Sequence, residues 1–398
     1  MPKPVETIDV LIIGAGASGL MCAIEAAKRK RSVLVVDHAA SPGRKIRMSG
    51  GGKCNFTNID ISSDHYISSN PHFCKSALKQ FSQWDFIHLL EKHHIEFEQR
   101  DHGQLFCKHS ASDILDMLLN QCAANHVSFV LNTTVNSIET ENKDGQFKIF
   151  TPSMVYCCNA LVIATGGLSI PGAGASPFGY KVAEQFNISV LPVRAGLVPL
   201  TLHLEDKAKL SQLSGIAVDA IVRTKKQSFR EKLLFTHRGL SGPVILQASS
   251  YWTLGQPICI NLLPEYPLFD TLKNTQKKGS KKTIKSILSA HLPKRLIQIM
   301  IEKNIADRSL QETSLKELDQ ICKSLQQWTL TPCGTEGYRT AEVTLGGVDC
   351  NEISSKTMEA LNIKGLFFIG EVLDVTGWLG GYNLQWAWSS GWCAGQTV

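Results

Sequence analysis

Three glycines near the start of the chain have the spacing of a dinucleotide-binding turn. Gly14, Gly16 and Gly19 form a G-x-G-x-x-G sequence, and an acid, Asp37, follows about 20 residues later. In such a turn the first glycine allows a tight bend, the second lets the backbone approach a pyrophosphate, and the third lets helix and strand pack closely. The helix N-terminus then binds the phosphate, and the acid accepts hydrogen bonds from a ribose. A glycine-rich structural turn is the disfavoured alternative. The pattern predicts dinucleotide contacts at Gly14, Gly16, Ala17, Ser18, Gly19, Asp37 and His38.

A second glycine-rich stretch, residues 43–58, combines three consecutive glycines at 50–52 with several basic side chains. Consecutive glycines form a backbone that a ligand can approach closely, and basic side chains can screen a pyrophosphate. A flexible surface loop with solvated charges is the alternative. The basic residues of this stretch are Arg44, Lys45, Arg47 and Lys53.

Near the other end of the chain, residues 365–369 predict a buried strand that ends at Glu371. An acid at a strand end can accept hydrogen bonds from ribityl hydroxyls. A helix with a glycine-rich start follows, and its positive end can point at a flavin pyrimidine. The three tryptophans of this helix, Trp386, Trp388 and Trp392, are interpreted as packing residues rather than a substrate platform.

The elements that must position these residues begin with a βαβ unit: a strand over 9–13, a helix over 20–28 and a strand over 32–36. Helical spacing continues over 75–93 and 112–124. A strand over 127–131, an antiparallel meander through 135–156 and a strand over 160–164 follow. This order predicts an α/β fold with a three-layer Rossmann-type FAD-binding domain.

Between residues 190 and 338 the pattern changes to an inserted domain. Strand-like runs at 197–204, 216–222, 233–236 and 258–262 predict a small β-domain, and a lysine-rich helical piece extends to about residue 327. Its basic residues could form a solvated face or a surface that binds the phosphates of a nucleic acid. The aromatic residues are sparse, which argues against base stacking. The basic residues form two groups: Arg223, Lys225, Lys226, Arg230 and Lys232, and then Lys273, Lys277, Lys278, Lys281, Lys282 and Lys285.

Composition sets further limits. The 398 residues are 43% hydrophobic and 19% charged, which is typical of a globular enzyme of two or three domains. We expect a cytoplasmic protein without a membrane partner, because no apolar run approaches the ~20 residues of a membrane span and no signal peptide is apparent. Twelve cysteines without a C-x-x-C pair argue against a disulfide scaffold, a redox dithiol or a zinc ribbon, and we predict no metal site. The net charge of +6 is compatible with a polyanionic partner.

Several motifs together resemble one bacterial family, the flavoproteins called YhiN or BaiN/RdsA-like NAD(P)/FAD-dependent oxidoreductases. The resemblance extends from Ile8 to Gln396. The motifs that carry it are Gly43-Arg44-Lys45 with Ser49-Gly50-Gly51-Gly52-Lys53-Cys54-Asn55, Leu234-Phe235-Thr236-His237 with Gly239-Leu240-Ser241-Gly242-Pro243, Glu342-Val343-Thr344, Gly370-Glu371-Val372-Leu373-Asp374, and Gly380-Gly381-Tyr382-Asn383.

The resemblance implies that FAD is bound by a domain built from both chain ends, 1–189 and 339–398. A β-barrel-like and helical insert, 190–338, would cover the flavin. No second G-x-G-x-x-G occurs, so NAD(P)H would act as a transient electron donor at the open flavin face. At Pro177-Phe178-Gly179 the chain departs from relatives that carry an Asp, and no contact is predicted there. The further contacts implied are Arg44, Lys45, Gly51, Gly52, Cys54, Asn55, Val135, Thr165, Gly166, Glu371, Asp374, Gly381, Asn383 and Leu384.

Members of this family that are linked to a reaction reduce a C=C bond conjugated to a carbonyl, in steroid-like bile-acid intermediates or in a uridine of large-subunit ribosomal RNA. The resemblance implies the RNA reaction first, a small-molecule enone reductase second and a non-catalytic FAD-binding redox protein third. Such a reduction needs an acid that protonates the substrate carbon. Cys54 is the first candidate, although a packed structural cysteine is an equal alternative. Tyr382 and His237 are the others.

Overall fold

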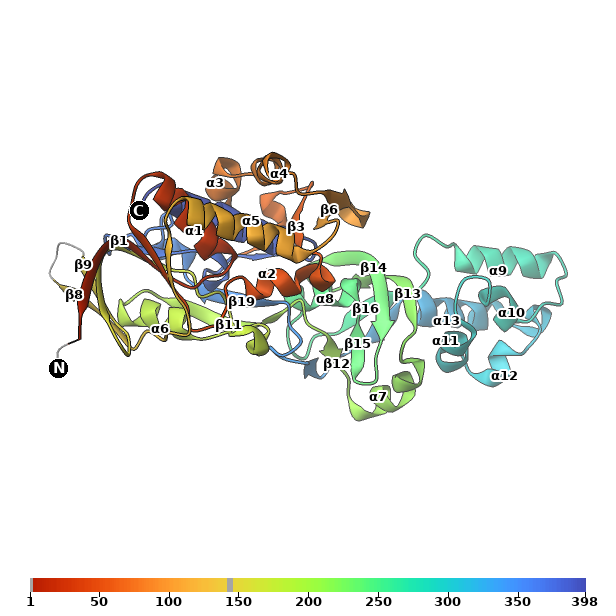
Figure 1. Cartoon of the computed structure of the whole chain (residues 1–398). Helices are drawn as coiled ribbons and strands as arrows, with labels where there is room; N and C mark the ends of the chain where they lie inside the picture. Colours follow the sequence, from red (N-terminus) through yellow and green to blue (C-terminus); the bar gives the residue numbers. More distant parts are fainter. Residues whose placement is uncertain (1–2, 142–145) are drawn as a thin grey trace. The chain divides into compact units, whose positions relative to one another are not determined.

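The computed structural model describes residues 3–141 and 146–398. It divides into two compact units, the first comprising Met1–Arg194 and Val343–Val398 and the second Ala195–Glu342. The first unit is therefore built from both chain ends, as the red and blue ends of the colour scale show in Figure 1. The assignment of FAD binding to the predicted domain 1–189 with 339–398, and of a cover to 190–338, stays a prediction.

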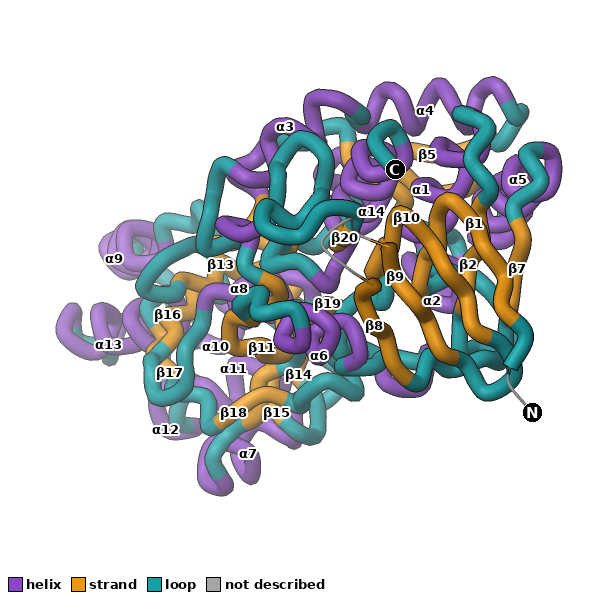
Figure 2. Tube along the Cα trace, turned by 90° about the vertical axis from the view of Figure 1, so that its left-hand side faces the viewer, coloured by secondary structure: helices purple, strands orange, loops and turns teal. Residues whose placement is uncertain are grey.

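A sheet with five parallel strands forms the centre of the first unit. The predicted βαβ opening is confirmed, and β1 starts earlier than expected. The parallel strands run in the order β7 (Ser128–Val130), β2 (Val33–Val36), β1 (Val5–Ile13), β10 (Val155–Ile163) and β20 (Leu366–Phe368). Figure 2 shows the first four side by side. The strands β2, β10 and β20 and the second half of β1 are apolar and mostly buried, which agrees with a parallel sheet covered on its faces, whereas the edge strand β7 is exposed or half-buried.

The carboxyl ends of these strands are in register. Val130 is the end of β7 and Val36 is its partner on β2, while Val36 in turn lies opposite Ile13 of β1. Ile163 lies opposite both Ile13 and Phe368. The loops that follow the five strands therefore leave the sheet along one edge, which is where ligands bind in sheets of this type.

An antiparallel excursion is attached to the first half of β10. The strands β8 (Ser137–Glu141) and β9 (Gln146–Phe150) pair with each other, and β9 pairs with Val155–Cys158 of β10. The separate strand predicted over 160–164 is wrong in extent, because one nine-residue strand serves both as the last meander strand and as the parallel partner of β1.

The helix α1 (Ala17–Lys28) packs on β1 and β2, and both α5 (Ala111–Ala124) and α14 (Tyr382–Gly395) pack on α1. Small residues allow α1 and α14 to approach closely, since a Cβ on Gly391 would lie 2.4 Å from the Ser18 carbonyl oxygen. The predicted helix over 75–93 is two helices, α3 (Phe73–Gln80) and α4 (Gln83–Lys92). Ser82 starts the second in a capping box, with its N–H donating to Asp85 at 2.7 Å.

Smaller elements complete the first unit. The strands β3 (Asn55–Asn58), β6 (Gln104–Cys107) and β5 (Phe97–Gln99) form a sheet in that order. Two further pairs are β11 (Val190–Gly196) with β19 (Val343–Val348), and β21 (Thr376–Gly377) with β4 (Tyr66–Ile67). The short helices are α2 (Arg44–Met48) and α6 (Phe178–Gln185).

The second unit begins with a seven-stranded antiparallel sheet, which confirms the predicted β-rich region. The predicted strand over 197–204 is wrong: only two of its residues form a strand, and α7 (Leu204–Leu210) starts at its end. Within the described chain the edge strands β17 and β18 do not pair with each other, so this sheet is open rather than a closed barrel. The order is β17 (Trp328–Leu330), β16 (Ile258–Asn261), β13 (Ala217–Arg223), β14 (Ser228–Phe235), β15 (Gly239–Ser241), β12 (Leu200–Thr201) and β18 (Gly334–Thr335).

Helices make up the rest of the second unit. The helix α8 (Pro243–Tyr251) packs on β14 and β13. The predicted lysine-rich helical piece is confirmed as α9 (Leu268–Lys277), α10 (Ile284–Leu288), α11 (Lys294–Met300), α12 (Lys303–Ala306) and α13 (Leu315–Gln326).

Candidate cofactor site

The turn between β1 and α1 has the geometry that its glycines predict. Gly14 has φ +116°, and a Cβ there would lie 2.4 Å from the Ala164 carbonyl oxygen. A Cβ on Gly19 would lie 2.0 Å from the Gly14 oxygen, so strand and helix touch through backbone. A Cβ on Gly16 would meet no atom within 4 Å, and no side chain of the described residues caps α1. The first N–H groups of this helix therefore face open space that a phosphate can enter.

Asp37 stands at the end of β2, beside this turn. Its Oδ2 accepts the Ala15 N–H at 2.7 Å, and its Oδ1 accepts the Ala39 N–H at 2.8 Å. The side chain is 14% exposed, and His38 Nδ1 lies 3.6 Å from Oδ1. Each carboxylate oxygen has a second lone pair, so Asp37 can hold both loops and still accept a ribose hydroxyl.

Thr165 follows β10 and adjoins the glycine turn, because a Cβ on Gly14 would lie 3.2 Å from the Thr165 nitrogen. The Thr165 Oγ1 is buried and has no hydrogen-bond partner in the described part of the chain. A buried hydroxyl left unsatisfied costs about 1–3 kcal/mol. Gly166 comes next with φ +69°. The Thr165 Oγ1 lies against α6, since a Cβ on Gly179 would be 2.3 Å from it, so the hydroxyl does not face the strand-end edge. What fits a dinucleotide at this edge is the open start of α1 at Gly16, beside the Asp37 carboxylate.

The side chains of Lys45 and Glu371 form an ion pair across the same edge. Lys45 Nζ, on α2, lies 2.9 Å from Glu371 Oε2 and also donates to Ser169 Oγ at 3.0 Å. Glu371 Oε1 accepts the Thr344 N–H at 2.9 Å and the Ser169 hydroxyl at 3.1 Å. Thr344 Oγ1 in turn accepts the N–H groups of Leu168 and Ser169. The network joins the loops after β10 and β20 to α2 and β19.

This network keeps Glu371 ionised. Burial raises the pKa of the Glu371 carboxyl, but the Lys45 charge and the hydrogen bonds from Lys45, Thr344 and Ser169 outweigh it, so the pKa lies below its ordinary value. Its oxygens already accept three donors, which makes Glu371 an anchor for the surrounding loops. Sequence reasoning missed Ser169 as a member, and no local pattern could reveal it.

The loop at residues 49–52 exposes backbone. Gly50, Gly51 and Gly52 have φ of +57°, +66° and +87°, and Cβ atoms on the last two would meet nothing within 4 Å. Cys54, just after it, has no exposed surface and lies in the hydrophobic core, and burial raises the pKa of its thiol to about 12. A side chain without exposed surface cannot touch a substrate. Cys54 is therefore not retained as the acid, and the alternative of a packed structural cysteine fits.

The predicted contacts near α14 are mostly engaged in holding loops. The Asn383 amide donates to the Gly377 and Trp378 carbonyl oxygens and accepts the Gly377 N–H at 2.8 Å. Asp374 is 6% exposed and accepts the Ser69 N–H at 2.7 Å, and burial raises the pKa of its carboxyl. Tyr382 is 5% exposed, and burial raises the pKa of its phenol to about 12.

Five other predicted contacts contribute less through their side chains. A Cβ on Gly381 would lie 2.3 Å from the Thr57 oxygen, so this glycine permits close backbone packing. Arg44 is exposed and donates to the Gly172 carbonyl oxygen at 2.7 Å. Val135 and Leu384 are half-buried against the core, and the Asn55 amide bonds to Gln104 of the neighbouring strand β6.

Three findings concern the whole described chain. All twelve cysteines are free. No group of three or more His, Cys, Asp or Glu side chains among residues 3–141 and 146–398 is placed to hold a metal ion. None of the helices formed by those residues is long and apolar enough to cross a membrane.

The parallel sheet, the glycine turn after β1 and the open N-terminus of α1 together define a Rossmann-type flavoprotein fold. Residues 8–397 match the family model described as HI0933-like protein Rossmann domain. The chain belongs to this family of FAD-dependent oxidoreductases.

Known proteins similar to this chain include two curated relatives and one solved structure. The ribosomal RNA dihydrouridine synthase of Escherichia coli is 52% identical over 395 residues, 99% of this chain and 98% of that protein. The 3-dehydro-bile acid delta(4,6)-reductase of Clostridium scindens is 28% identical over 97% of this chain and 98% of that protein. The 3-ketosteroid-delta4-(5alpha)-dehydrogenase of Rhodococcus jostii has a similar fold, with a TM-score of 0.51 at 12% identity over 100% of this chain and 99% of that one.

Proposed function

We propose that this protein reduces a uridine of large-subunit ribosomal RNA to dihydrouridine, with NAD(P)H as the electron donor. The observation that carries the proposal is the 52% identity, over 99% of the chain, to a protein named ribosomal RNA dihydrouridine synthase. Each turnover would consume one NAD(P)H and one proton and saturate one C=C bond conjugated to a carbonyl. FAD, when bound, supplies the hydride for that bond. The proposed substrate places the reaction in the cytoplasm.

The residues of the first unit would hold the cofactor in three places. The N–H groups at the start of α1 would bind the pyrophosphate above Gly16, and Asp37 would accept a ribose hydroxyl. The exposed backbone at Gly51 and Gly52 would contact the ring system. Lys45 and Glu371 would fix the loops that surround these groups.

Exposed lysines at the end of α9 support an RNA substrate. Within the described chain, four exposed lysines of this segment form no ion pair within 4.0 Å. By contrast, Lys285 lies 3.5 Å from Asp307, and Arg230 pairs with Asp219 and Glu265. Unpaired lysines can replace the counterions of phosphates, which makes RNA binding depend steeply on salt. The four are Lys277, Lys278, Lys281 and Lys282.

The first experiment measures dihydrouridine in large-subunit ribosomal RNA from cells with and without this gene. We expect the modified base to disappear on deletion and to return with the wild-type gene. The purified FAD-loaded protein with NAD(P)H should also form it in RNA from the deletion strain. An unchanged content in the deletion strain would refute the proposed substrate.

A second experiment tests the lysines. Replacing all four with Gln should lower the slope of log affinity against log salt by about 0.7–0.9 for each phosphate that the protein no longer neutralises. The control removes the same charge from the first unit and should leave the slope unchanged. An equal change in both variants would contradict the role of α9. The control residues are Lys75, Lys79, Lys92 and Lys356, all exposed.

A small-molecule enone reductase is the second candidate. The 28% identity to a bile-acid reductase over 97% of this chain favours it. A neutral steroid-like substrate predicts a KM that is almost independent of salt, which separates this candidate from the RNA reaction.

A further inference from the structure

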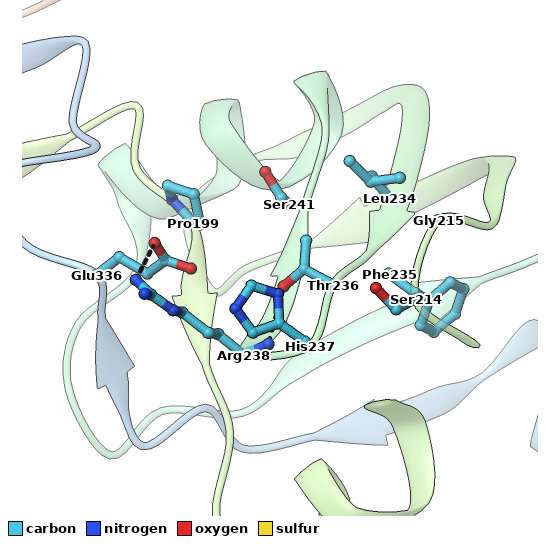
Figure 3. A pocket seen from close by; sticks show the side chains of 10 residues that line it. All are labelled: Pro199, Ser214, Gly215, Leu234, Phe235, Thr236, His237, Arg238, Ser241 and Glu336. Atoms are coloured by element: carbon cyan, nitrogen blue, oxygen red, sulfur yellow. Dashed lines mark hydrogen bonds and ion pairs between the residues drawn. The ribbon is translucent and has the colours of Figure 1, made fainter. Parts of the chain in front are cut away.

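The second unit contains a pocket of about 430 Å³ at the turn between β14 and β15 (Figure 3). This volume is within the range of small-ligand sites. The pocket is built on the motif Leu234-Phe235-Thr236-His237 and Gly239-Leu240-Ser241, which the cofactor site does not use. Leu234 and Pro199 give it apolar walls, whereas the Phe235 side chain is buried beneath it.

Hydrogen bonds fix the backbone of the pocket. Thr236 Oγ1 accepts the N–H groups of Arg238 at 3.2 Å and Gly239 at 3.1 Å, which holds the turn. The Glu336 N–H donates to the Pro199 carbonyl oxygen at 3.0 Å, next to the β12–β18 pair. A Cβ on Gly239 would lie 2.1 Å from the Leu200 oxygen, so β12 packs directly against the turn. The residues that carry the polar groups are therefore preorganised.

Three side chains present polar groups along one wall. Arg238 Nη1 lies 3.3 Å from Glu336 Oε2, and the two side chains are 43% and 11% exposed. The described residues provide no other hydrogen bond to this guanidinium or to Glu336 Oε1. His237 is exposed beside Arg238 and lines the same pocket. The wall thus offers donors, a carboxylate acceptor and an imidazole.

We propose that this pocket binds the uracil ring of a uridine in the substrate RNA through its imide edge. Glu336 would accept the uracil N3–H, while Arg238 and His237 would donate to the two flanking carbonyl oxygens. The apolar walls would contact the faces of the ring. This inference rests on the proposed function for the identity of the RNA and adds residues that select the base.

The charge pattern favours uracil over other ligands. Cytosine has an acceptor at N3, which would face the Glu336 carboxylate and leave both groups without a donor. A phosphate would be repelled by the same carboxylate. The neutral imide has an acceptor, a donor and an acceptor in a row, which Arg238, Glu336 and His237 would complement with a donor, an acceptor and a donor.

The test measures the affinity of the FAD-loaded, full-length protein for three probes by fluorescence anisotropy. The probes are oligouridylate, oligocytidylate and an oligouridylate methylated at N3, all of one length. The wild type should bind the first about tenfold more tightly than the other two, as expected for one hydrogen bond to a charged group. Glu336→Gln and Arg238→Lys should reduce this preference severalfold or more. Glu265→Gln, at a carboxylate that is 78% exposed and outside the pocket, should keep it.

The outcomes separate this inference from the proposed function. Equal binding of the three probes by the wild type, or an unchanged preference in Glu336→Gln, would overturn the inference. Dihydrouridine formation in ribosomal RNA, measured alongside, reports on the proposed function. Turnover by the wild type together with unchanged kcat/KM in both pocket variants would refute the pocket and leave the reaction standing. A uridine preference without turnover would support the pocket and refute the proposed function.

Discussion

Replacing Lys45 with Met should destabilise the first unit, because it leaves the Glu371 carboxylate without its ion-pair partner. Removing one partner of a fully buried pair costs about 3–5 kcal/mol. Lys45 and Glu371 are 33% and 21% exposed, and two other donors still reach Glu371. We therefore expect a loss of about 1–3 kcal/mol in the free energy of unfolding at pH 8.

The loss should also depend on pH. In the wild type the pKa of Glu371 is below its ordinary value, so its stabilising contribution is fully present above the unfolded pKa of 4.5 and is lost only as the pH falls through the folded pKa. Without Lys45, burial is the largest remaining influence on the Glu371 carboxyl, so we expect its folded pKa to lie above 4.5. The variant then loses stability as the pH rises through that pKa. The deficit should be larger at pH 8 than at pH 5.

The assay is urea unfolding of the apoprotein at both pH values, followed by circular dichroism and compared at equal m-values. The control is Lys108→Met, which breaks an exposed pair with Glu96 at 2.6 Å. That distance is shorter than in the Lys45 pair. Both groups of the control pair are nevertheless solvated, so the change in the free energy of unfolding should be much smaller. Equal losses in the two variants, or a Lys45→Met deficit that does not change with pH, would refute the reasoning.

Three further predictions concern the first unit. Gly19→Ala should abolish the visible flavin absorbance of the purified protein, because its Cβ would lie 2.0 Å from the Gly14 oxygen, whereas Gly172→Ala, which meets nothing within 4 Å, should keep it. Thr165→Val should raise the free energy of unfolding of the apoprotein by about 1–3 kcal/mol in urea unfolding, since it removes a buried hydroxyl that has no partner within the described residues; a less stable variant would contradict this. Cys54→Ala should lower the melting temperature through a core cavity and leave kcat of the folded fraction unchanged, and loss of kcat alone would restore Cys54 as the acid.

The local parts of the fold could be predicted from sequence, and the contacts between distant segments could not. The β1–α1–β2 unit is encoded in neighbouring residues, so the periodicity of its apolar residues and the spacing of its glycines predict it. The break between α3 and α4 had a local signal, Ser82 with Asp85, that the apolar spacing obscured. The run at 197–204 shows the limit, since a short apolar segment does not distinguish strand from helix start.

The cofactor site likewise has parts that the sequence predicts and parts that it does not. The roles of Gly14 and Gly19 follow from one continuous motif, and the structure gives the distances that explain them. The pairing of Lys45 with Glu371 joins residues that are 326 positions apart, and only the sheet register brings them together. The burial of Cys54 likewise depends on the three-dimensional packing around it, which a glycine-rich sequence does not predict.

The return of the chain to the first unit has a consequence for its synthesis. β20 and α14 are made after the second unit, and α14 packs on α1 and on β3, with Trp388 donating to the Phe56 carbonyl oxygen of β3 at 3.0 Å. A ribosome therefore releases the second unit, one continuous segment, before the first unit has its final strand and helix. Until then the nascent chain presents an uncovered apolar helix face and an unpaired half-strand of β10. These surfaces are where a chaperone would bind and where a prematurely terminated chain would aggregate.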